Sequence, residues 1–381
     1  MKITIVMGFF LPVPPVAGGA TEKIWFRLAR EFALAHHTVT VISRTWPGFP
    51  ASETLDGVHM VRVPGFDHTR QLWRNLLLDA LWGWRVRRYL PPADVVVCNT
   101  VSLPVWLRML KPEAGRVAAV LGRMPKGQVR AYRGVDLLLA PSNAVADRAK
   151  TQNRRLAGRI HVFSNPIDWT LHAQASRKSV PLKIGYVGRI HPEKGLGLLF
   201  EAAAILAADP TLPPWRLQII GPVAVSHGGG GAAYLDSLTS AYGSRLDGRL
   251  QILPPEYDSA RLAACYGAID IFCYPSVAAS GETFGIAVAE AMAAGAVPVV
   301  SRLAVFRDLV VPARNGLVFD HEAPTAARDL AALLAGLLSR PPLRAALAAQ
   351  AQVDARHYDY TESARDLLAR FDRLTIAANR D

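Results

Sequence analysis

Residues 181–207 read PLKIGYVGRIHPEKGLGLLFEAAAILA, and this stretch decides the fold. A short apolar run is followed by a loop that contains glycine, arginine and lysine, and then by a longer apolar run of helix-forming residues. Such a strand–loop–helix unit is typical of a parallel sheet whose faces are covered by helices. The loop therefore lies where a strand ends and a helix begins, which is where doubly wound sheets bind ligands.

The same alternation runs through the chain in two series. The first series comprises KITIVMGFF, TEKIWFRLAREFALA, HTVTVISR, VHMVRV, DVVVCNT, RVAAVLG and DLLLAPS. The second continues from the opening stretch with WRLQIIGP, RLQILP, IDIFCYPS and AVPVVS. Continuous apolar strands separated by helices predict two doubly wound α/β domains with parallel sheets. We expect the domains to span residues 1–166 and 180–360, joined near Asn165–Val180, and a last helix at about 361–381 to pack back across the join.

Composition places the chain among globular proteins. Its 381 residues are 51% apolar and 19% charged, and no apolar run approaches the ~20 residues that span a bilayer. We interpret the opening MKITIVMGFF as a first buried strand rather than a signal peptide, because prolines interrupt the apolar stretch that follows. Cys98, Cys265 and Cys273 lack metal-ligand spacing, and their odd number argues against a disulfide framework, so we expect a reducing cytoplasm.

The net charge of +12 is carried by the first half of the chain. Residues 1–170 hold 23 Lys and Arg against 11 Asp and Glu, whereas residues 171–381 hold 20 of each sign. We therefore expect an anionic partner to meet the first half only. No recognisable RNA- or DNA-binding module accompanies the high isoelectric point, so we expect no nucleic-acid partner.

Two glutamates bracket a glycine-containing turn in the stretch GETFGIAVAE, residues 281–290. The glycines predict a loop and a helix that begins near Ile286, whose free amides make an anion site. Glu290 lies one turn inside that helix, where its charge would repel an anion, so it needs another partner such as hydroxyl groups. Phosphate plus vicinal hydroxyls describes a nucleotide sugar. The alternative is a capped amphipathic helix in which Glu282 and Glu290 are solvated.

Two further loops follow strands and are candidates for the same ligand. Gly18 and Gly19 precede the first helix and allow close backbone approach. In GRIHPEKG, Arg189 and Lys194 lie five residues apart, and two cations beside a glycine at such a junction suit a diphosphate. A solvated basic loop is the alternative. We interpret the GGGG of SHGGGGAAYLDSL as a flexible active-site loop rather than a phosphate cradle.

The sequence lacks the motifs of several other kinds of nucleotide-binding and catalytic site. No strand is followed by G-x-G-x-x-G, and no G-x-x-x-x-G-K-[ST], H-E-x-x-H or G-x-S-x-G appears. No two aspartates stand at i and i+2, so the simplest metal-carrying pair is missing. We expect no cofactor and no metal, with a nucleoside-diphosphate sugar as the donor substrate.

Together these motifs resemble the retaining GT-B glycosyltransferases of the GT4 family, also called glycosyl transferases group 1. The resemblance rests on GGATEKIWFRLAREFALAHHTVTVIS, APSNAVADRA, VFSNPID, YVGRIHPEKGLGLLFEA, GETFGIAVAEAMAAGAVPVVS and NGLVFD. It covers most of the chain and implies two Rossmann-like domains that face each other across a cleft. The first domain would lie on the acceptor side, and the second would bind a nucleotide sugar, for which we expect a UDP- or GDP-linked donor.

The resemblance also implies roles for individual residues. Arg189 and Lys194 would neutralise the donor diphosphate, Glu290 would bind the ribose hydroxyls, and Glu282 would contact the transferred sugar. The family's front-face route lets the departing phosphate take the proton, so no protein nucleophile is required. The implied catalytic residues are Glu282, Arg189 and Lys194. The implied donor-binding residues are Gly18, Gly19, Arg189, Lys194, Glu282, Thr283, Phe284, Gly285, Ile286 and Glu290.

The first domain departs from the family at one loop. Many relatives carry a histidine there that contacts the donor sugar, whereas this chain reads GRMPKGQ, so Arg123 and Lys126 are candidate acceptor or sugar contacts. An epimerase of the same fold and an inactive nucleotide- or carbohydrate-binding protein remain alternatives. The intact pairs Arg189/Lys194 and Glu282/Glu290 argue against the inactive protein.

Residues 69–90 read TRQLWRNLLLDALWGWRVRRYL, an apolar helical pattern that contains tryptophans and arginines. This combination favours the membrane–water boundary, although a helix packed on the sheet with its tryptophans in the core is the alternative. Because the charge excess lies in the half expected to bind acceptor, we expect peripheral association with the anionic inner face of the cell membrane. The acceptor would be a glycan, a glycolipid or a polyprenyl-diphosphate-linked sugar, in cell-surface or exopolysaccharide synthesis. The side chains in question are Trp73, Trp82, Trp84, Arg74, Arg85, Arg87 and Arg88.

Overall fold

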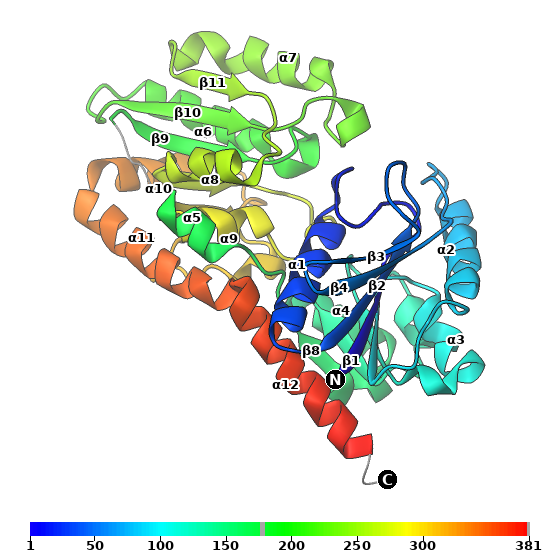
Figure 1. Cartoon of the computed structure of the whole chain (residues 1–381). Coiled ribbons are helices and arrows are strands. Elements are labelled where there is room, and N and C mark those ends of the chain that lie inside the picture. The colour runs from blue at the N-terminus through cyan, green and yellow to red at the C-terminus, as the bar shows by residue number, and fades with distance from the viewer. Residues whose placement is uncertain (176–179, 379–381) are drawn as a thin grey trace. The chain divides into compact units, whose positions relative to one another are not determined.

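The structure is a computed structural model that describes residues 1–175 and 180–378. The chain divides into two compact units: unit 1 is Met1–Pro166 with the helix that begins at Tyr360, and unit 2 is Ile167–Asp359. Each unit is built on a sheet of parallel or mainly parallel strands with helices on its faces (Figure 1). The predicted fold class, two doubly wound α/β domains, is confirmed.

In unit 1, eight strands form one sheet in the order β3-β4-β2-β1-β5-β6-β7-β8. Every neighbouring pair is parallel except β3 with β4. β5 and β7 are buried at every residue, which explains why they read as continuous apolar runs. The strands are β1 (Lys2–Val6), β2 (Thr38–Arg44), β3 (Ser52–Leu55), β4 (Val58–Val63), β5 (Val95–Cys98), β6 (Arg116–Val120), β7 (Leu137–Ala140) and β8 (Ile160–Val162).

Helices cover both faces of this sheet. Helices α2 and α3 lie on one face, where they contribute Trp82 and Leu103 to a core shared with Val6 of β1 (Figure 1). On the other face, the ring of Phe32 in α1 lies 6.2 Å from that of Phe371 in α12. The last helix therefore packs on α1, within unit 1. The helices are α1 (Ala20–Leu34), α2 (Leu72–Val86), α3 (Leu103–Leu110), α4 (Asn143–Gln152) and α12 (Tyr360–Ala378).

The helix expected in residues 69–90 is α2, and the structure separates its tryptophans. Trp73 is 63% exposed and Trp84 is 48% exposed. Trp82 is fully buried, and its Nε1 donates a hydrogen bond to the carbonyl of Met7 at 2.9 Å. The membrane-boundary interpretation is therefore wrong for Trp82, because this residue faces the sheet. Helical periodicity puts positions 73 and 84, but not 82, on the outer side.

In unit 2, six strands form a fully parallel sheet in the order β11-β10-β9-β12-β13-β14. The strands are β9 (Leu182–Val187), β10 (Trp215–Ile220), β11 (Leu250–Leu253), β12 (Ile271–Tyr274), β13 (Val297–Ser301) and β14 (Leu317–Phe319). The helices are α5 (Trp169–Gln174), α6 (Leu196–Ala207), α7 (Ala232–Tyr242), α8 (Ser259–Gly267), α9 (Ile286–Ala293), α10 (Ala326–Ser339) and α11 (Pro341–Ala355).

Unit 2 begins earlier than the expected residue 180. Helix α5 packs on α8 and α9, and Trp169 Nε1 donates a hydrogen bond to the carbonyl of Gln352 at 2.9 Å. The segment from Ile167 through α5 therefore belongs to unit 2 rather than to a linker. A helix of six residues is too short to show a periodic pattern, so nothing in the sequence indicates α5. Residues 176–179 of the expected join lie outside the described residues.

Among the described residues, no single helix has both the length and the hydropathy of a membrane span, although α10 and the segment Pro341–Tyr358 meet that test together as a pair bent by 100°.

Candidate functional site

Three loops of unit 2 meet where parallel strands of one sheet end. They follow β9, β10 and β12 and are joined by backbone hydrogen bonds: the Gly230 amide donates to Ile190 at 2.8 Å, and the Val277 amide donates to Glu193 at 2.9 Å. Gly195 adopts a positive φ of 68°, and a Cβ there would lie 1.9 Å from the carbonyl oxygen of Pro275. Only glycine therefore lets the β9 loop approach the β12 loop so closely.

Lys194 and Glu282 form a buried ion pair at this meeting point. The ammonium of Lys194 donates to Glu282 Oε1 at 2.5 Å, and the Ser276 hydroxyl donates to the same oxygen at 2.8 Å. Lys194 is 5% exposed and Glu282 is 7% exposed. The sequence predicted both residues at the site, but it did not predict their contact or the part played by Ser276. The pair places a cation and a carboxylate next to each other. Oε1 of that carboxylate already accepts hydrogen bonds from Lys194 and Ser276.

The rings of two tyrosines, stacked on each other, lie next to this ion pair. The Lys194 ammonium lies 5.6 Å from the centroid of the Tyr274 ring, which stacks on Tyr186 with 5.6 Å between centroids. Burial, with the charge of Glu282 added, raises the pKa of both phenols well above their usual range. Both tyrosines therefore stay neutral, and Glu282 supplies the negative charge that Lys194 faces.

Arg189 lies on the same loop but is more exposed. Its guanidinium donates to Glu193 Oε1 at 2.6 Å and to the carbonyl of Gly228 at 3.0 Å. Gly228 begins the tetraglycine, for which the sequence predicts a flexible loop. In the structure the tetraglycine belongs to the β10–α7 connection, and the amides of Gly229, Gly230 and Gly231 all donate to backbone carbonyls. The tetraglycine thus holds the Arg189 side chain by its backbone.

Helix α9 begins at Ile286, as predicted. Its N-cap residue Gly285 has a φ of 114°, and a Cβ there would lie 3.0 Å from the ring of Phe306. The first helical hydrogen bond is donated by Val288 to Gly285, so the amides before Val288 have no intrahelical acceptor. Phe284 is buried with its ring against Tyr358, so it can offer an anion only its backbone amide, and the neighbouring Thr283 is half-buried.

Glu290 lies in α9 and has two partners that sequence reasoning missed. His172 Nε2 lies 3.7 Å from Glu290 Oε1, and the Tyr266 hydroxyl hydrogen-bonds to the same carboxylate. Burial and the charge of Glu290 raise the pKa of Tyr266 well above its usual range, so the phenol remains a neutral donor. His172 comes from α5, which lies in the segment where the sequence predicts the join. Because Glu282 precedes the helix, the two glutamates do not share one helical face.

The remaining predicted residues lie in unit 1. Gly18 and Gly19 precede α1 with φ values of 81° and 101°. A Cβ on Gly19 would lie 2.2 Å from the carboxylate of Glu22, a residue that is 4% exposed and whose pKa is raised by burial. A carboxylate that sequence reasoning missed therefore already lies beside these glycines.

Arg123 and Lys126 are exposed on the loop after β6 in unit 1. Within the described residues, no three His, Cys, Asp or Glu side chains gather as a metal site.

Two sequence profiles match consecutive parts of the chain. The profile described as Glycosyltransferase Family 4 matches residues 18–170, and the profile described as Glycosyl transferases group 1 matches residues 168–354. The chain belongs to the GT4 family of glycosyltransferases. In this GT4 chain the second profile begins at residue 168, next to the Ile167 at which unit 2 starts.

Individual GT4 relatives are more distant. The D-inositol 3-phosphate glycosyltransferase of Rhodococcus jostii is 31% identical over 268 residues, which are 66% of this chain and 56% of that relative. This match therefore spans little more than half the relative's length. The GDP-mannose-dependent alpha-mannosyltransferase of Mycolicibacterium smegmatis is 27% identical over 356 residues, with 84% of each chain covered.

Solved structures share the fold of this GT4 chain. HepE from Anabaena, solved in complex with UDP and glucose, has a TM-score of 0.69 and 19% sequence identity, with 98% of this chain and 100% of HepE covered. At 19% sequence identity, this similarity shows only that the two proteins share a fold. Together with the two profiles it confirms the GT-B fold that the sequence motifs implied.

Proposed function

We propose that this protein is a glycosyltransferase that moves a sugar from a nucleoside diphosphate to an acceptor with retention of anomeric configuration. The observation that carries the proposal is the Lys194–Glu282 pair in contact distance at the loops that lead into α6 and α9. Family membership supports the reaction class. Fold alone would not, because one fold hosts many chemistries.

Each residue of the site has a part in this reaction. Arg189 and Lys194 face the donor diphosphate, and their charge becomes more valuable as the diphosphate leaves. The amides of Thr283–Ile286 bind a phosphate oxygen at the N-terminus of α9. Glu290 accepts the ribose hydroxyls, and Glu282 accepts a hydroxyl of the transferred sugar.

The acceptor attacks from the face that the diphosphate leaves, and the leaving phosphate oxygen takes the acceptor's proton. A transition state with a positively charged sugar and a departing diphosphate needs cations at the phosphate more than it needs a protein nucleophile. Arg189 and Lys194, which the loop between β9 and α6 brings to the site, fit that requirement.

We infer that the donor carries uridine or guanosine diphosphate. Two comparisons support these two bases: HepE was solved with UDP, and the Mycolicibacterium relative is named as GDP-mannose-dependent. For the acceptor we propose an anionic, lipid-linked molecule, such as a glycolipid or a polyprenyl-diphosphate-linked glycan of cell-surface polysaccharide synthesis. The charge excess of residues 1–170 supports an anionic acceptor and association with the inner face of the cell membrane.

Thermal melting against UDP-, GDP-, ADP- and dTDP-sugars tests the donor. We expect a UDP- or GDP-sugar to raise the melting temperature by several degrees, because a ligand at ~100 times its Kd adds about 2.7 kcal/mol to the free energy of unfolding. Glucose and mannose without a nucleotide serve as controls. If no sugar nucleotide shifts the melting temperature, the proposed donor class is wrong.

Chelation tests how the leaving group is stabilised. Because Arg189 and Lys194 supply the positive charge in this proposal, we expect EDTA to leave the transfer rate nearly unchanged. The rate is measured before and after dialysis against EDTA, and again after adding back Mg²⁺ or Mn²⁺. A strict requirement for a divalent ion would contradict the assignment of the two cations.

A further inference from the structure

Helices α2 and α3 carry an unusual number of exposed apolar side chains. Of the 20 large apolar residues that are exposed in the described chain, 11 fall within residues 72–110. Trp73 is 63% exposed and Met109 is 77% exposed. We name this surface the α2–α3 face. Its apolar members are Leu72, Trp73, Leu76, Leu77, Leu81, Trp84, Val105, Met109 and Leu110.

The α2–α3 face is not an incomplete core, because the opposite side of α2 is fully packed. Trp82 and Val86 are buried against the sheet. The buried carboxylate of Asp79 ties α2 to the start of α3 by accepting from the Ser102 amide at 2.7 Å and from the Ser102 hydroxyl at 2.6 Å. The apolar residues of α2 recur at three- and four-residue spacing on the other side. The fold therefore holds this apolar stripe toward the outside.

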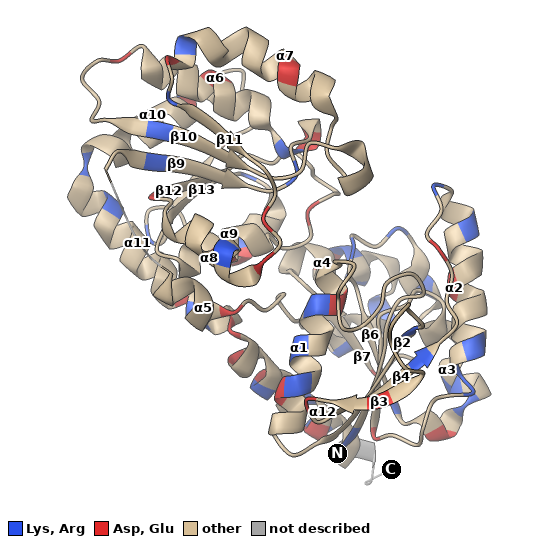
Figure 2. Cartoon of the chain, turned by 45° about the horizontal axis from the view of Figure 1, so that its top comes forward, with Lys and Arg blue, Asp and Glu red and all other residues tan. Residues whose placement is uncertain are grey.

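The same face is strongly basic. Between residues 68 and 93 the sole acid is the buried Asp79, and α3 has no acid. Arg74 of α2 and Arg88, just after α2, are exposed, and Figure 2 shows Lys and Arg along α2 and α3. Arg87 lies 3.5 Å from the centroid of the Trp84 ring. Arginine beside exposed tryptophan is the combination found where a protein meets the headgroups of a bilayer.

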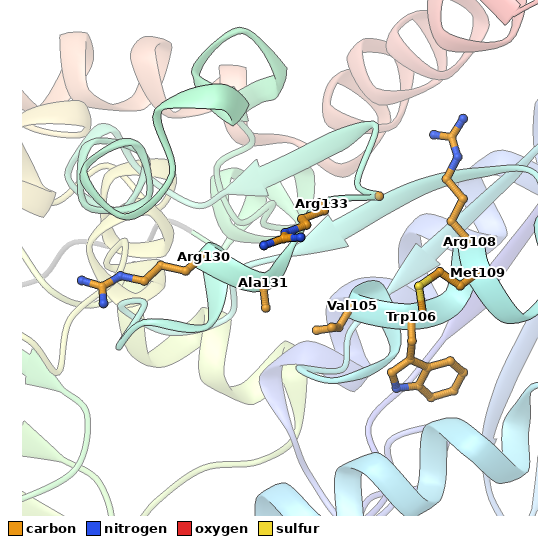
Figure 3. A pocket seen from close by; sticks show the side chains of 8 residues that line it. Val105, Trp106, Arg108, Met109, Arg130, Ala131 and Arg133 are labelled. Atoms are coloured by element: carbon orange, nitrogen blue, oxygen red, sulfur yellow. The ribbon is translucent and has the colours of Figure 1, made fainter.

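A shallow cavity of about 690 Å³ continues the face beyond α3 (Figure 3). Val105, Trp106 and Met109 give it an apolar wall, and the Trp106 ring lies 6.4 Å from that of Trp84. Arg130 and Arg133 line it from the segment that follows β6, and neither has an acidic partner among the described residues. Arg108 also lines it but is paired with Asp136 at 3.0 Å. An apolar wall with unpaired arginines suits a lipid phosphate next to its acyl chains.

We infer that the α2–α3 face docks this protein on an anionic lipid bilayer, with Trp73 and Trp84 at headgroup level and a lipid phosphate at Arg130 and Arg133. Charge favours this occupant over a second copy of the chain, because a symmetric dimer through this face would set its arginines against each other. The inference deepens the proposed membrane association and rests on that part of the proposed function. Its test uses no sugar nucleotide, so its failure is distinguishable from failure of the donor assignment.

Vesicle sedimentation of the full chain tests the inference. We expect binding to vesicles of phosphatidylcholine mixed with phosphatidylglycerol, weak binding to phosphatidylcholine alone, and release as ionic strength approaches 1 M, where the screening length falls to about 3 Å. Trp73→Ser/Trp84→Ser should weaken binding by roughly 10-fold or more, because the variant lacks both indole rings that would bury apolar surface in the bilayer interface. Arg130→Ala/Arg133→Ala should weaken it by about 30-fold, since each basic contact near an anionic surface is worth about 1 kcal/mol.

As matched controls, two variants replace exposed apolar residues or exposed arginines that lie outside the α2–α3 face and its cavity. Leu34→Ser/Val353→Ser and Arg216→Ala/Arg261→Ala should bind vesicles like the unaltered chain. Because all these side chains lie on the surface, the melting temperature of every variant should stay near that of the unaltered chain, which separates lost binding from lost folding. Three outcomes overturn the inference: no vesicle binding, binding that ignores lipid charge and salt, or self-association that the tryptophan variants abolish.

Discussion

Lys194→Ala is expected to lower turnover by about 100-fold or more. In the proposed reaction the ammonium neutralises a diphosphate whose charge grows as it departs, so its removal affects the transition state more than the bound donor. Arg189→Ala should lower turnover to a similar extent, because it removes the second cation of the same loop. Turnover is measured under saturating donor and acceptor, with the donor identified first from the melting series.

The structure adds a second consequence for Lys194→Ala alone. Glu282 is 7% exposed and would lose its cationic partner, and breaking a buried ion pair in this way lowers the free energy of unfolding in other proteins by about 3–5 kcal/mol. Arg189→Ala should have a much smaller effect on stability, because its side chain is 42% exposed.

A double variant separates these two consequences. Lys194→Ala/Glu282→Gln should recover much of the stability, because the buried charge is gone, but none of the turnover. Lys183→Ala is the matched control, because Lys183 lies at the start of β9 while Lys194 follows its end. Urea unfolding and turnover are measured on the unaltered chain, on Lys194→Ala, on the double variant and on Lys183→Ala. If Lys194→Ala kept nearly full turnover while remaining folded, the assignment of Lys194 to the leaving group would be wrong.

The two domains were predictable because parallel strands buried on both faces have continuous apolar sequences. The runs DVVVCNT and DLLLAPS coincide with β5 and β7, in which every residue is buried. The start of α9 was predictable from Gly285, whose positive φ suits a residue without a side chain. Helix α5 was not, because six residues are fewer than two helical turns.

The sequence predicted that Lys194 and Glu282 lie on loops at the ends of strands in one sheet, but it did not predict that their side chains touch. Lys194 and Glu282 are 88 positions apart, and nothing periodic in the sequence indicates that their side chains meet. Ser276, Gly228 and Tyr266 became partners only because parallel strands bring their loops to one edge of the sheet. Such pairings depend on strand order, which the sequence pattern does not encode.

The tryptophans of α2 also show that the sequence pattern does not determine which side chains become buried within one helix. Composition predicted an amphipathic segment with tryptophan and arginine, but only the packing of α2 on the sheet decides which rings remain outside. Trp82 and Trp84 are two positions apart, which is about half a turn, so one enters the core and the other is exposed.

Glu290→Ala is expected to weaken the binding of UDP or GDP by roughly 30- to 1000-fold, which corresponds to the 2–4 kcal/mol of a partly buried carboxylate that accepts two hydroxyl hydrogen bonds. Tyr266→Phe should weaken it by about 5-fold, because the ring keeps its packing while the hydroxyl that hydrogen-bonds to Glu290 is lost. Glu201→Ala, an exposed acid on α6, should leave binding unchanged. Binding is measured by titration calorimetry with the bare nucleoside diphosphate.

Glu282→Gln should behave differently from Glu290→Ala, and the difference separates the two acids. The amide still accepts a hydrogen bond from Lys194, but it no longer neutralises the ammonium, so Lys194 faces the diphosphate with its full charge. Affinity for the bare nucleoside diphosphate should therefore stay the same or increase, while turnover falls because the sugar hydroxyl loses a charged acceptor. Equal losses of nucleoside-diphosphate affinity in Glu282→Gln and Glu290→Ala would mean that both acids bind the nucleotide and that neither is reserved for the sugar.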